Sequence, residues 1–294
     1  MILSCSQVVY QMSAVNAPAL RIPDKSKITV QTQDCFANQL NSDKQKMDAL
    51  DWERINPATG PLYIEGAMPG DTLKIAIDEI KTAGWGIMAA IPGAGVLGSV
   101  VEESQIKRIR VQENTAWFTE EIHLPCHPMI GVIGVAPREG GIPCGEPGSH
   151  GGNMDNTKIA AGSTLYLPVF HPGALLAMGD VHACMGDGEI MVSGLEIPAE
   201  VTVTVEVLKN ITIEDPMLED KHACYTIASH EDLEKAIFTA THTMTKILMA
   251  KKNLSLNDAG MLLSAAGNLQ FCQVVDPKRT VRMEVKKTLL DRLI

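Results

Sequence analysis

The sequence predicts a mainly β protein, with a sandwich or jelly-roll-like core of antiparallel strands followed by a C-terminal α/β portion. Many short segments alternate apolar and polar side chains, as in ITVQTQDCF and VTVTVEVL, and Gly- or Pro-rich turns separate them. Strong helical spacing of apolar residues occurs once, over residues 231–252. We place the core in residues 1–220 and the α/β portion in 221–294, either as two domains or as one.

In the first half of the chain, alternation predicts strands at 28–36, 62–64, 72–80, 106–111 and 129–135. Residues 43–51 are polar and predict a loop or a short helix. Clusters of Asn, Pro, Gly and Asp predict turns at 56–61 and 69–71. Residues 136–152 hold three prolines and six glycines, which predict a long shaped loop.

In the second half, residues 163–170 and 174–178 predict two strands of a hairpin joined at His171-Pro172-Gly173. A long helix is expected from Glu231 to Lys252, with Ser229 as N-cap and an order of charges that complements the helix dipole. The remaining elements are a turn at 215–220, a short helix opening at 255–263, and strands at 190–192, 201–208, 224–228, 269–275 and 280–285.

The amino-acid composition indicates which kinds of partner and which cellular compartment to expect. The formal net charge of −10 argues against nucleic acid and anionic membrane surfaces, because both call for Lys/Arg clusters. No apolar run approaches about 18 residues, so no membrane span is predicted. Seven cysteines form no C-x-x-C pair and are odd in number, unlike a secreted disulfide framework, so a cytoplasmic location is expected. A homo-oligomer, dimer or tetramer, is expected because symmetric assemblies are common.

Residues 150–190 hold two polar clusters around a short apolar stretch, which predicts the base of an active site. The first cluster is His150, Asn153, Asp155 and Asn156, and the second is Asp180, His182, Asp187 and Glu189. The expected hairpin would bring them together. Carboxylate oxygens and imidazole nitrogens suit a divalent cation such as zinc.

Asp and Asn among glycines also form turns, and a histidine in an apolar stretch can be a core residue. The density of charge favours a site, because such groups are costly to bury without a cation or full hydrogen bonding.

The same stretch contains GGNMD, AGSTLYLPV, a GALL-MGD-H step and GDGE. In order and spacing, these motifs resemble the acetamidase/formamidase family, enzymes that hydrolyse small linear amides to a carboxylic acid and ammonia. Further matches are NPATGPLYIEGA followed by PGD, MIGVIGVA, and Asp34-Cys35-Phe36, so the resemblance covers most of the chain. It implies a jelly-roll sandwich fold. The sequence departs from the family pattern at Val181, Cys184 and Met185, which bears on substrate preference more than on reaction type.

The resemblance implies hydrolysis of formamide, acetamide or a close relative, and the clustered carboxylates and imidazole favour a metal-dependent reaction. A divalent cation, zinc first and with a second ion such as calcium as a further option, would polarise the amide oxygen and activate water. The expected ligands are Asp34, Asp180 and His182, followed by Asp187 and Asp155. Either Glu65 or Glu189 would act as general base and later acid, Asn153 would hold the amide oxygen, and His150 and Asn56 would contact the substrate.

Other interpretations of the sequence are weaker. The run Gly93–Gly98 matches G-x-G-x-x-G, but seven residues between Gly98 and Ile106 are too few for a parallel crossover, so we expect a glycine-rich loop near the substrate entrance. His123, Cys126 and His127 lack a fourth zinc ligand at a familiar spacing.

Two alternatives concern the function itself. One alternative is a covalent mechanism with a serine or cysteine nucleophile. The sequence has no G-x-S-x-G elbow, and Cys184 has no partner that would activate it. The contrasting class is a non-enzymatic β-sandwich binding module, for instance for a sugar, in which the polar cluster holds a structural calcium ion.

Overall fold

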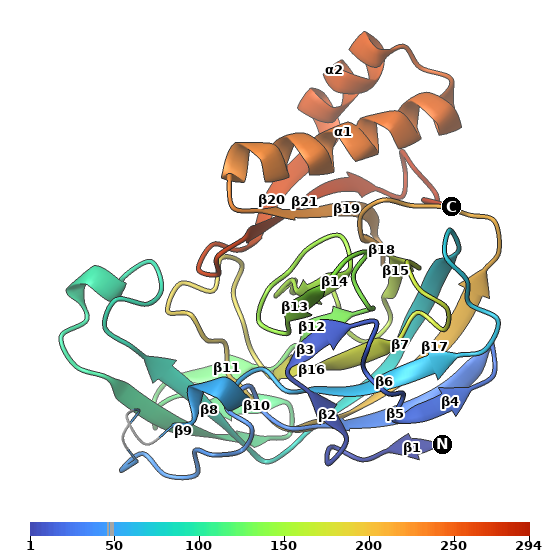
Figure 1. Cartoon of the computed structure of the whole chain (residues 1–294). Helices are drawn as coiled ribbons and strands as arrows, with labels where there is room; N and C mark the ends of the chain where they lie inside the picture. The colour runs from blue at the N-terminus through green and yellow to red at the C-terminus, as the bar shows by residue number, and fades with distance from the viewer. Residues whose placement is uncertain (46, 48–49) are drawn as a thin grey trace.

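Two large β-sheets enclose the main core of this computed structural model, which describes residues 1–45, 47 and 50–294 (Figure 1). The larger sheet has nine strands in the order β1-β5-β17-β7-β15-β18-β19-β21-β20. In chain order these strands are β1 (Ile2–Leu3), β5 (Ser26–Thr32), β7 (Thr72–Thr82), β15 (Thr164–Pro168), β17 (Ala199–Leu208), β18 (Met217–Glu219), β19 (Ala223–His230), β20 (Gly267–Gln273) and β21 (Arg279–Lys286).

The second sheet has six strands, five in the order β14-β12-β16-β6-β2 with β4 also paired to β6. They are β2 (Val8–Val9), β4 (Leu20–Ile22), β6 (Ala58–Ile64), β12 (Met129–Gly134), β14 (Gly151–Asn153) and β16 (Leu176–His182). A four-stranded sheet extends to one side of it: β8 (Trp85–Ala90), β9 (Gln105–Gln112), β10 (Thr115–Trp117) and β11 (His123–Pro125) (Figure 1). A small pair is formed by β3 (Gln11–Ser13) and β13 (Gly141–Pro143), and two 3-10 turns are η2 (Trp52–Arg54) and η3 (Gly98–Val100).

The strand alternation in the sequence builds the core between the two sheets. In β17 the valines at 201, 203, 205 and 207 are buried, while the residues between them are more exposed. Leu73 and Leu165 of the larger sheet belong to the same buried cluster as Leu62 and Met178 of the smaller one. Burial of such side chains contributes about 1.5–3 kcal/mol each, so the sandwich is held mainly by this cluster. The mainly β prediction is therefore confirmed.

The C-terminal portion adds two helices, α1 (Leu233–Lys252) and α2 (Leu256–Ala266), above β19, β20 and β21 (Figure 1). Ala236, Ala240, Met244 and Leu248 recur every four residues of α1 and are buried in a second apolar cluster. Within the described part of the chain, neither helix is long and apolar enough to cross a membrane. The larger sheet continues through residue 220, because β18 pairs with β19.

Helix α1 starts later than the sequence suggested. The side chain of Asp232 accepts a hydrogen bond from Glu234 N and is the N-cap, whereas Ser229 is still in β19. Ser229 pairs with Thr280 in the sheet, so the chain turns into the helix only after residue 230. Ser255 is the N-cap of α2, where the second helix was expected to open.

Several predicted segments also differ from the structure. Residues 58–61 were expected to be a turn but belong to β6, where pairing with β2 and β16 overrides the local turn preference. The strand expected at 28–36 ends at Thr32. No strand forms at 190–192, because Val192 adopts a left-handed backbone with φ 68°. Short strands β13 and β18 lie in an expected loop and an expected turn. The interpretation of 43–51 lies partly outside the described residues.

The predicted hairpin of residues 163–170 and 174–178 is wrong. Strand β15 pairs with β7 and β18 in the larger sheet, whereas β16 pairs with β12 and β6 in the smaller one. The connection at residues 169–175 therefore crosses between the two sheets. Four of the five residues of β15 and all seven of β16 are buried, so no exposed face in either sequence reveals which neighbours the strand pairs with.

One polar anchor joins the turn before β7 to the end of β17. Asp71 Oδ2 accepts hydrogen bonds from Lys209 Nζ at 2.6 Å and Met68 N at 2.9 Å, and Oδ1 accepts one from Asn210 N at 3.1 Å. Burial alone would raise the pKa of Asp71, but these hydrogen bonds to its charged form, with the Lys209 charge, outweigh burial and hold the pKa below its usual range.

We predict that Asp71→Asn lowers the free energy of unfolding by about 2 kcal/mol at pH 7, because three donors lose a charged acceptor. A depressed folded-state pKa stabilises the fold above the ordinary Asp value of about 3.9, and this stabilisation is lost as the pH falls through the folded-state pKa. Urea unfolding at a series of pH values should therefore show the difference between wild type and variant shrinking in acid. Exposed Asp291→Asn should stay within about 0.5 kcal/mol throughout. A difference that stayed constant into acid would contradict the prediction.

Candidate active site

Three neighbouring strands of the six-stranded sheet bring the two polar clusters together. Strand β12 lies between β14 and β16, so that Val132 pairs with Asn153 on one side and with Gly179 on the other. Asp155 and Asp180 consequently meet over Gly131 of β12. A Cβ atom at position 131 would lie 2.5 Å from Asp155 Oδ1 and 2.6 Å from Asp180 Oδ2. Glycine at this position leaves the space that the two carboxylates occupy.

His182, the last residue of β16, is at the centre of a buried acidic cluster. Its Nε2 lies 3.0 Å from Glu196 Oε2, 3.3 Å from Asp180 Oδ1 and 3.9 Å from Asp155 Oδ1. All four side chains are at most 4% exposed. The site residues predicted at 155, 180 and 182 are thus brought together, although by β12 rather than by a hairpin.

Two sets of three potential ligands are found among the described residues. Asp155, His182 and Glu189 form one set, and Cys35, Asp180 and Glu196 the other, each with ligand atoms within 4.8 Å of one another. Cys35 and Glu196 were not predicted as ligands from the sequence. An acidic residue inside the apolar run Leu195-Glu196-Ile197 was the signal that could have identified it.

The backbone is strained where these acids are attached. Asp155, Asp180 and Glu189 all adopt positive φ, at 41°, 54° and 49°. Non-glycine residues rarely occupy this region, and such conformations cluster at functional sites because they persist only where the surrounding structure enforces them. Three strained acids in one cluster indicate that the geometry serves the site rather than the stability of the fold.

Several buried polar atoms of the cluster have no hydrogen-bond partner in the described structure. They are Asp155 Oδ1, His182 Nδ1 and Asn153 Oδ1, whereas Asp180 Oδ1 and Glu196 Oε2 face the His182 imidazole as ion-pair partners. Unpaired buried oxygens are costly, and native proteins normally satisfy them. A divalent cation coordinated by carboxylate oxygens and an imidazole nitrogen would satisfy such a set, so the residues present fit a metal ion.

Burial and neighbouring charges shift the pKa values of the acids and the histidine in the cluster. Burial raises the pKa of Asp155 and Glu196 well above the usual range and that of Glu189 to about 7. For Asp180, burial is outweighed by the charge of His182 and by hydrogen bonds, and its pKa is lowered. Burial also acts against protonation of His182, but Glu196 and Asp180 outweigh it and raise its pKa. The cluster therefore strongly attracts positive charge.

Other predicted residues border the cluster. Asp34 is buried, which raises its pKa to about 6, and its Oδ1 accepts a hydrogen bond from Asn38 N at 2.7 Å, so it also closes a local turn. Asn153 Nδ2 donates to Asp276 Oδ2 at 2.9 Å. Asp276 comes from the turn between β20 and β21 and was missed, because Asp276-Pro277 resembles an ordinary turn sequence.

Three predicted residues lie outside the cluster. Glu65 is exposed just after β6, whereas Asp180 is beside the first residue of that strand, roughly 20 Å away at 3.3 Å per residue. Asp187 forms an ion pair with Arg282 and accepts a hydrogen bond from Thr157 Oγ1 at 2.7 Å. His150 is buried, and burial lowers its pKa to about 4, but the side chain is not among those that line the cavity described below.

Arg282 connects the C-terminal portion to the site. Its fully buried guanidinium donates to Asn156 Oδ1 at 2.9 Å and to Asp187, while Nε donates to Gln270 Oε1 at 2.6 Å. Asn156 follows Asp155 in the chain, and Asp187 is two residues before Glu189. Arg282 therefore positions both segments that carry the first set of potential ligands.

A cavity of about 300 Å³ opens over the cluster. Its base includes Asn153, Asp180, Glu189, Glu196 and Asp276, and Asn56 lies in its wall. Ala94, from the glycine-rich loop, also lines it, which agrees with the expected place of that loop near an entrance.

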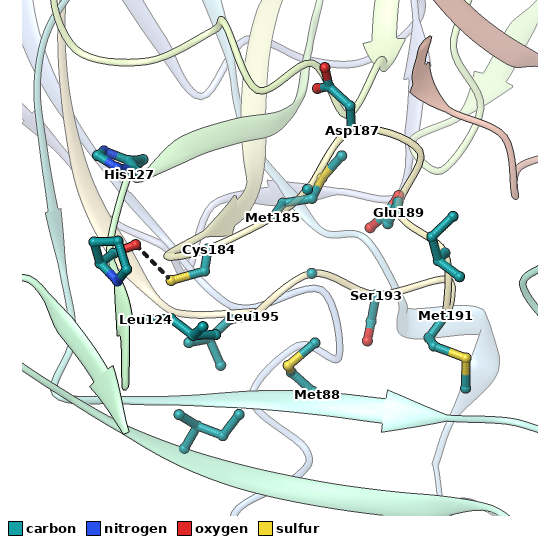
Figure 2. Close-up of a pocket in the computed structure, with 15 residues that line it drawn as sticks. Met88, Leu124, His127, Cys184, Met185, Asp187, Glu189, Met191, Ser193 and Leu195 are labelled. Atoms are coloured by element: carbon teal, nitrogen blue, oxygen red, sulfur yellow. Dashed lines mark hydrogen bonds between the residues drawn. The ribbon is translucent and has the colours of Figure 1, made fainter. Parts of the chain in front are cut away.

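A second cavity of about 440 Å³ shares Glu189 and Ser193 with the first. Met88, Met185 and Met191 lie around it, and Cys184 Sγ donates to Pro125 O at 3.6 Å at one end (Figure 2). The segment 184–195 separates the two cavities, with its ends held by the hydrogen bond from Leu195 N to Cys184 O.

Fold and site together define a β-sandwich protein with a buried cluster of carboxylates and imidazole at the base of one cavity. The chain belongs to the acetamidase/formamidase family, whose model matches residues 15–140 and 141–252. A putative formamidase of Schizosaccharomyces pombe is 27% identical, over 64% of this chain and 61% of its own length. The formamidase of Methylophilus methylotrophus is 24% identical, over 62% and 59%. The chain thus spans about three fifths of the length of these curated relatives.

Solved structures match the whole chain. A Bacillus halodurans acetamidase is 41% identical with a TM-score of 0.97 and covers 100% of this chain and 99% of its own. A predicted acetamidase/formamidase from Thermoanaerobacter tengcongensis is 45% identical with a TM-score of 0.96, covering 99% and 97%. A gamma lactamase from Delftia acidovorans, at 19% identity and a TM-score of 0.69, shares the fold. The family resemblance deduced from the motifs is confirmed.

We predict that Gly131→Ala weakens Zn²⁺ binding by at least about tenfold, because the added methyl group displaces the Asp155 and Asp180 carboxylates. Overpacking should also lower the free energy of unfolding by about 1–3 kcal/mol. Calorimetric titration with Zn²⁺ and urea unfolding measure the two effects. The matched control is Gly260→Ala in α2, where an added Cβ meets nothing within 4 Å and should stabilise the fold by about 0.5–1 kcal/mol. Unchanged Zn²⁺ binding in Gly131→Ala would show that position 131 does not shape the site.

Proposed function

We propose that this protein hydrolyses short linear amides of the formamide and acetamide type to a carboxylate and ammonia, using water activated at a divalent metal site. The observation that carries the proposal is the buried cluster of carboxylates around the His182 imidazole, three of whose acids, Asp180, Glu189 and Glu196, line the 300 Å³ cavity. Membership of the acetamidase/formamidase family and similarity to proteins named formamidase and acetamidase support the choice of substrate.

His182, Asp180, Asp155 and Glu196 would hold the cation, with Asp34 and Cys35 close to them. A bound divalent cation supplies Lewis acidity, which polarises the amide oxygen and lowers the pKa of water. Mixed imidazole and carboxylate ligands favour zinc, and the excess of oxygens would suit a second, harder ion such as calcium. Asp187 is the weakest of the expected ligands, because Arg282 already occupies its carboxylate.

Glu189 is the general base and acid in this proposal, since its carboxylate lines the cavity beside Asp155 and His182. It would take a proton from water and deliver it to the departing nitrogen. Glu65 lies outside the cavity and cannot reach a substrate there. Asn153 uses one amide hydrogen on Asp276, which leaves its second N–H for the amide oxygen or the developing oxyanion. Asn56 in the wall, and His150 behind Gly152, would support substrate orientation.

A cytoplasmic location and an even-numbered homo-oligomer complete the proposal. Their support is the odd number of cysteines, all free thiols, and the general frequency of symmetric assemblies.

The test is ammonia release from formamide, acetamide and propionamide, with metal content measured on the same preparation. We expect turnover that is lost on chelation and restored by Zn²⁺. His182→Ala should lose bound metal and lower kcat/KM by at least about 1000-fold, because it removes a ligand at the centre of the cluster. Exposed His222→Ala is the matched control and should keep both. Fully metal-loaded protein that released no ammonia from these amides would favour the binding-module alternative, and full activity in His182→Ala would remove this residue from the site.

A further inference from the structure

The cavity over the cluster has two chemically different parts. Its base is acidic, with Asp180, Glu189, Glu196 and Asp276. Most of its wall is apolar and is formed by Phe36, Trp52, Ile55, Ile91, Ala94 and Val192, with the polar Asn56 and Ser193 beside them. Trp52 is 49% exposed at the rim, whereas Phe36 is buried against the smaller apolar cluster that includes Ile55 and Ile91. A ligand that fills the cavity must present a polar group to the base and an apolar group to this wall.

The size of the cavity exceeds the needs of the smallest amides. An engineered cavity of about 150 Å³ holds a benzene ring. The 300 Å³ here leave space for a ring or chain of similar size in addition to a carboxamide. Formamide carries no carbon beyond its carbonyl and acetamide carries one, so both would leave the apolar wall in contact with water. That contact forfeits the favourable burial of apolar surface.

We propose that the preferred substrates are primary amides whose acyl group is uncharged and apolar and carries about five to six carbons beyond the carbonyl, such as hexanamide or benzamide. This inference rests on the proposed amide hydrolysis and names its substrate class. The carboxamide lies at the acidic base, where the reacting groups are, and the acyl group lies against the apolar wall. The reverse orientation would bury hydrocarbon among carboxylates and is disfavoured by their desolvation.

The charge of the lining also selects against some substrates. The lining residues that the structure describes include four acids and no Lys or Arg. An acyl group that ends in a carboxylate, as in succinamate, would bring a negative charge to the apolar wall, where no Lys or Arg is present to pair with it. Monoamides of dicarboxylic acids should therefore be poor substrates even when their length fits.

The second cavity provides the control for this assignment. Successive residues of a strand point to opposite faces, and accordingly Met88 of β8 lines the second cavity while Ala89 lines the catalytic one. Figure 2 shows Met88 among the side chains that line the second cavity, together with Met185 and Met191. If the acyl group occupied the second cavity, changes at Met88 would alter chain-length preference. If it lies against the wall of the first, changes at Ala94 or Trp52 would do so.

The experiment measures kcat/KM of the metal-loaded protein for formamide, acetamide, butyramide, hexanamide, benzamide and succinamate. Each buried methylene should raise kcat/KM by about threefold to fourfold, discounted where the cavity is open to water. We expect hexanamide to exceed acetamide by at least about tenfold, and succinamate to fall below butyramide by at least about tenfold. The diagnostic quantity is the hexanamide-to-acetamide ratio.

Two variants act on the wall in opposite ways. Ala94→Phe fills the cavity and Trp52→Ala removes apolar surface from its rim, and each should lower the diagnostic ratio by at least about fivefold. Met88→Leu, in the second cavity, should leave the ratio unchanged. Circular dichroism checks that each variant is folded, and Trp52→Ala, at an exposed position, keeps the test available if Ala94→Phe fails to fold.

The outcomes separate this inference from the function it depends on. Hydrolysis of formamide and acetamide with a diagnostic ratio at or below one would overturn the inference and leave amide hydrolysis standing. A ratio that falls in Met88→Leu but not in the wall variants would place the acyl group in the second cavity and would also overturn it. Absence of ammonia release from every amide would instead reject the proposed function.

Discussion

Four buried carboxylic acids surround one imidazole in a space with little access to water, and this concentration of charge constrains the structure around it. Uncompensated buried charge costs several kcal/mol per group, so the acids must share protons or coordinate a cation. Three of these acids adopt a backbone conformation with positive φ. The absence of a side chain at Gly131 leaves the space that the Asp155 and Asp180 carboxylates occupy. Burial of apolar side chains in the sandwich core stabilises the fold enough to maintain this strained backbone.

The C-terminal portion is part of the site rather than a support added to a finished core. Its β20–β21 turn delivers Asp276 to the cavity, and Arg282 of β21 fixes the segments that carry Asp155 and Glu189. Both contacts are possible because the nine-stranded sheet continues from β15 through β18 into β19, β21 and β20. Helices α1 and α2 bury the outer face of these strands and so hold the turn and Arg282 in place. The acidic base and the apolar wall of the cavity thus draw on residues from both ends of the chain.

Motif order and local pattern revealed the family and the acids at 155, 180 and 189, because these lie in one stretch rich in glycine and polar side chains. The same local density suggested Asp187 as a ligand, and its carboxylate forms an ion pair with Arg282. Glu65 was chosen from a family-like segment, yet strand β6 carries it to the opposite end of the sheet from Asp180. Glu196 and Asp276 were not predicted as site residues. Glu196 is surrounded in the sequence by apolar residues and Asp276 by turn residues, and each joins the site only through folding. Cys184 and Met185, where the sequence departs from the family pattern, line the second cavity.

By itself, the sequence determined the class of fold, most strands, both helices and the family, because periodicity, capping and motif spacing are local properties of the chain. It could not determine that β15 and β16 belong to different sheets, since a strand buried on both faces has no polar side to mark its partner. Tertiary structure alone decided which acids meet His182, which acid pairs with Arg282, and that apolar side chains from residues 36 to 192 form one wall over an acidic base. Those choices depend on contacts between residues distant in the chain, and such contacts leave no periodic signal.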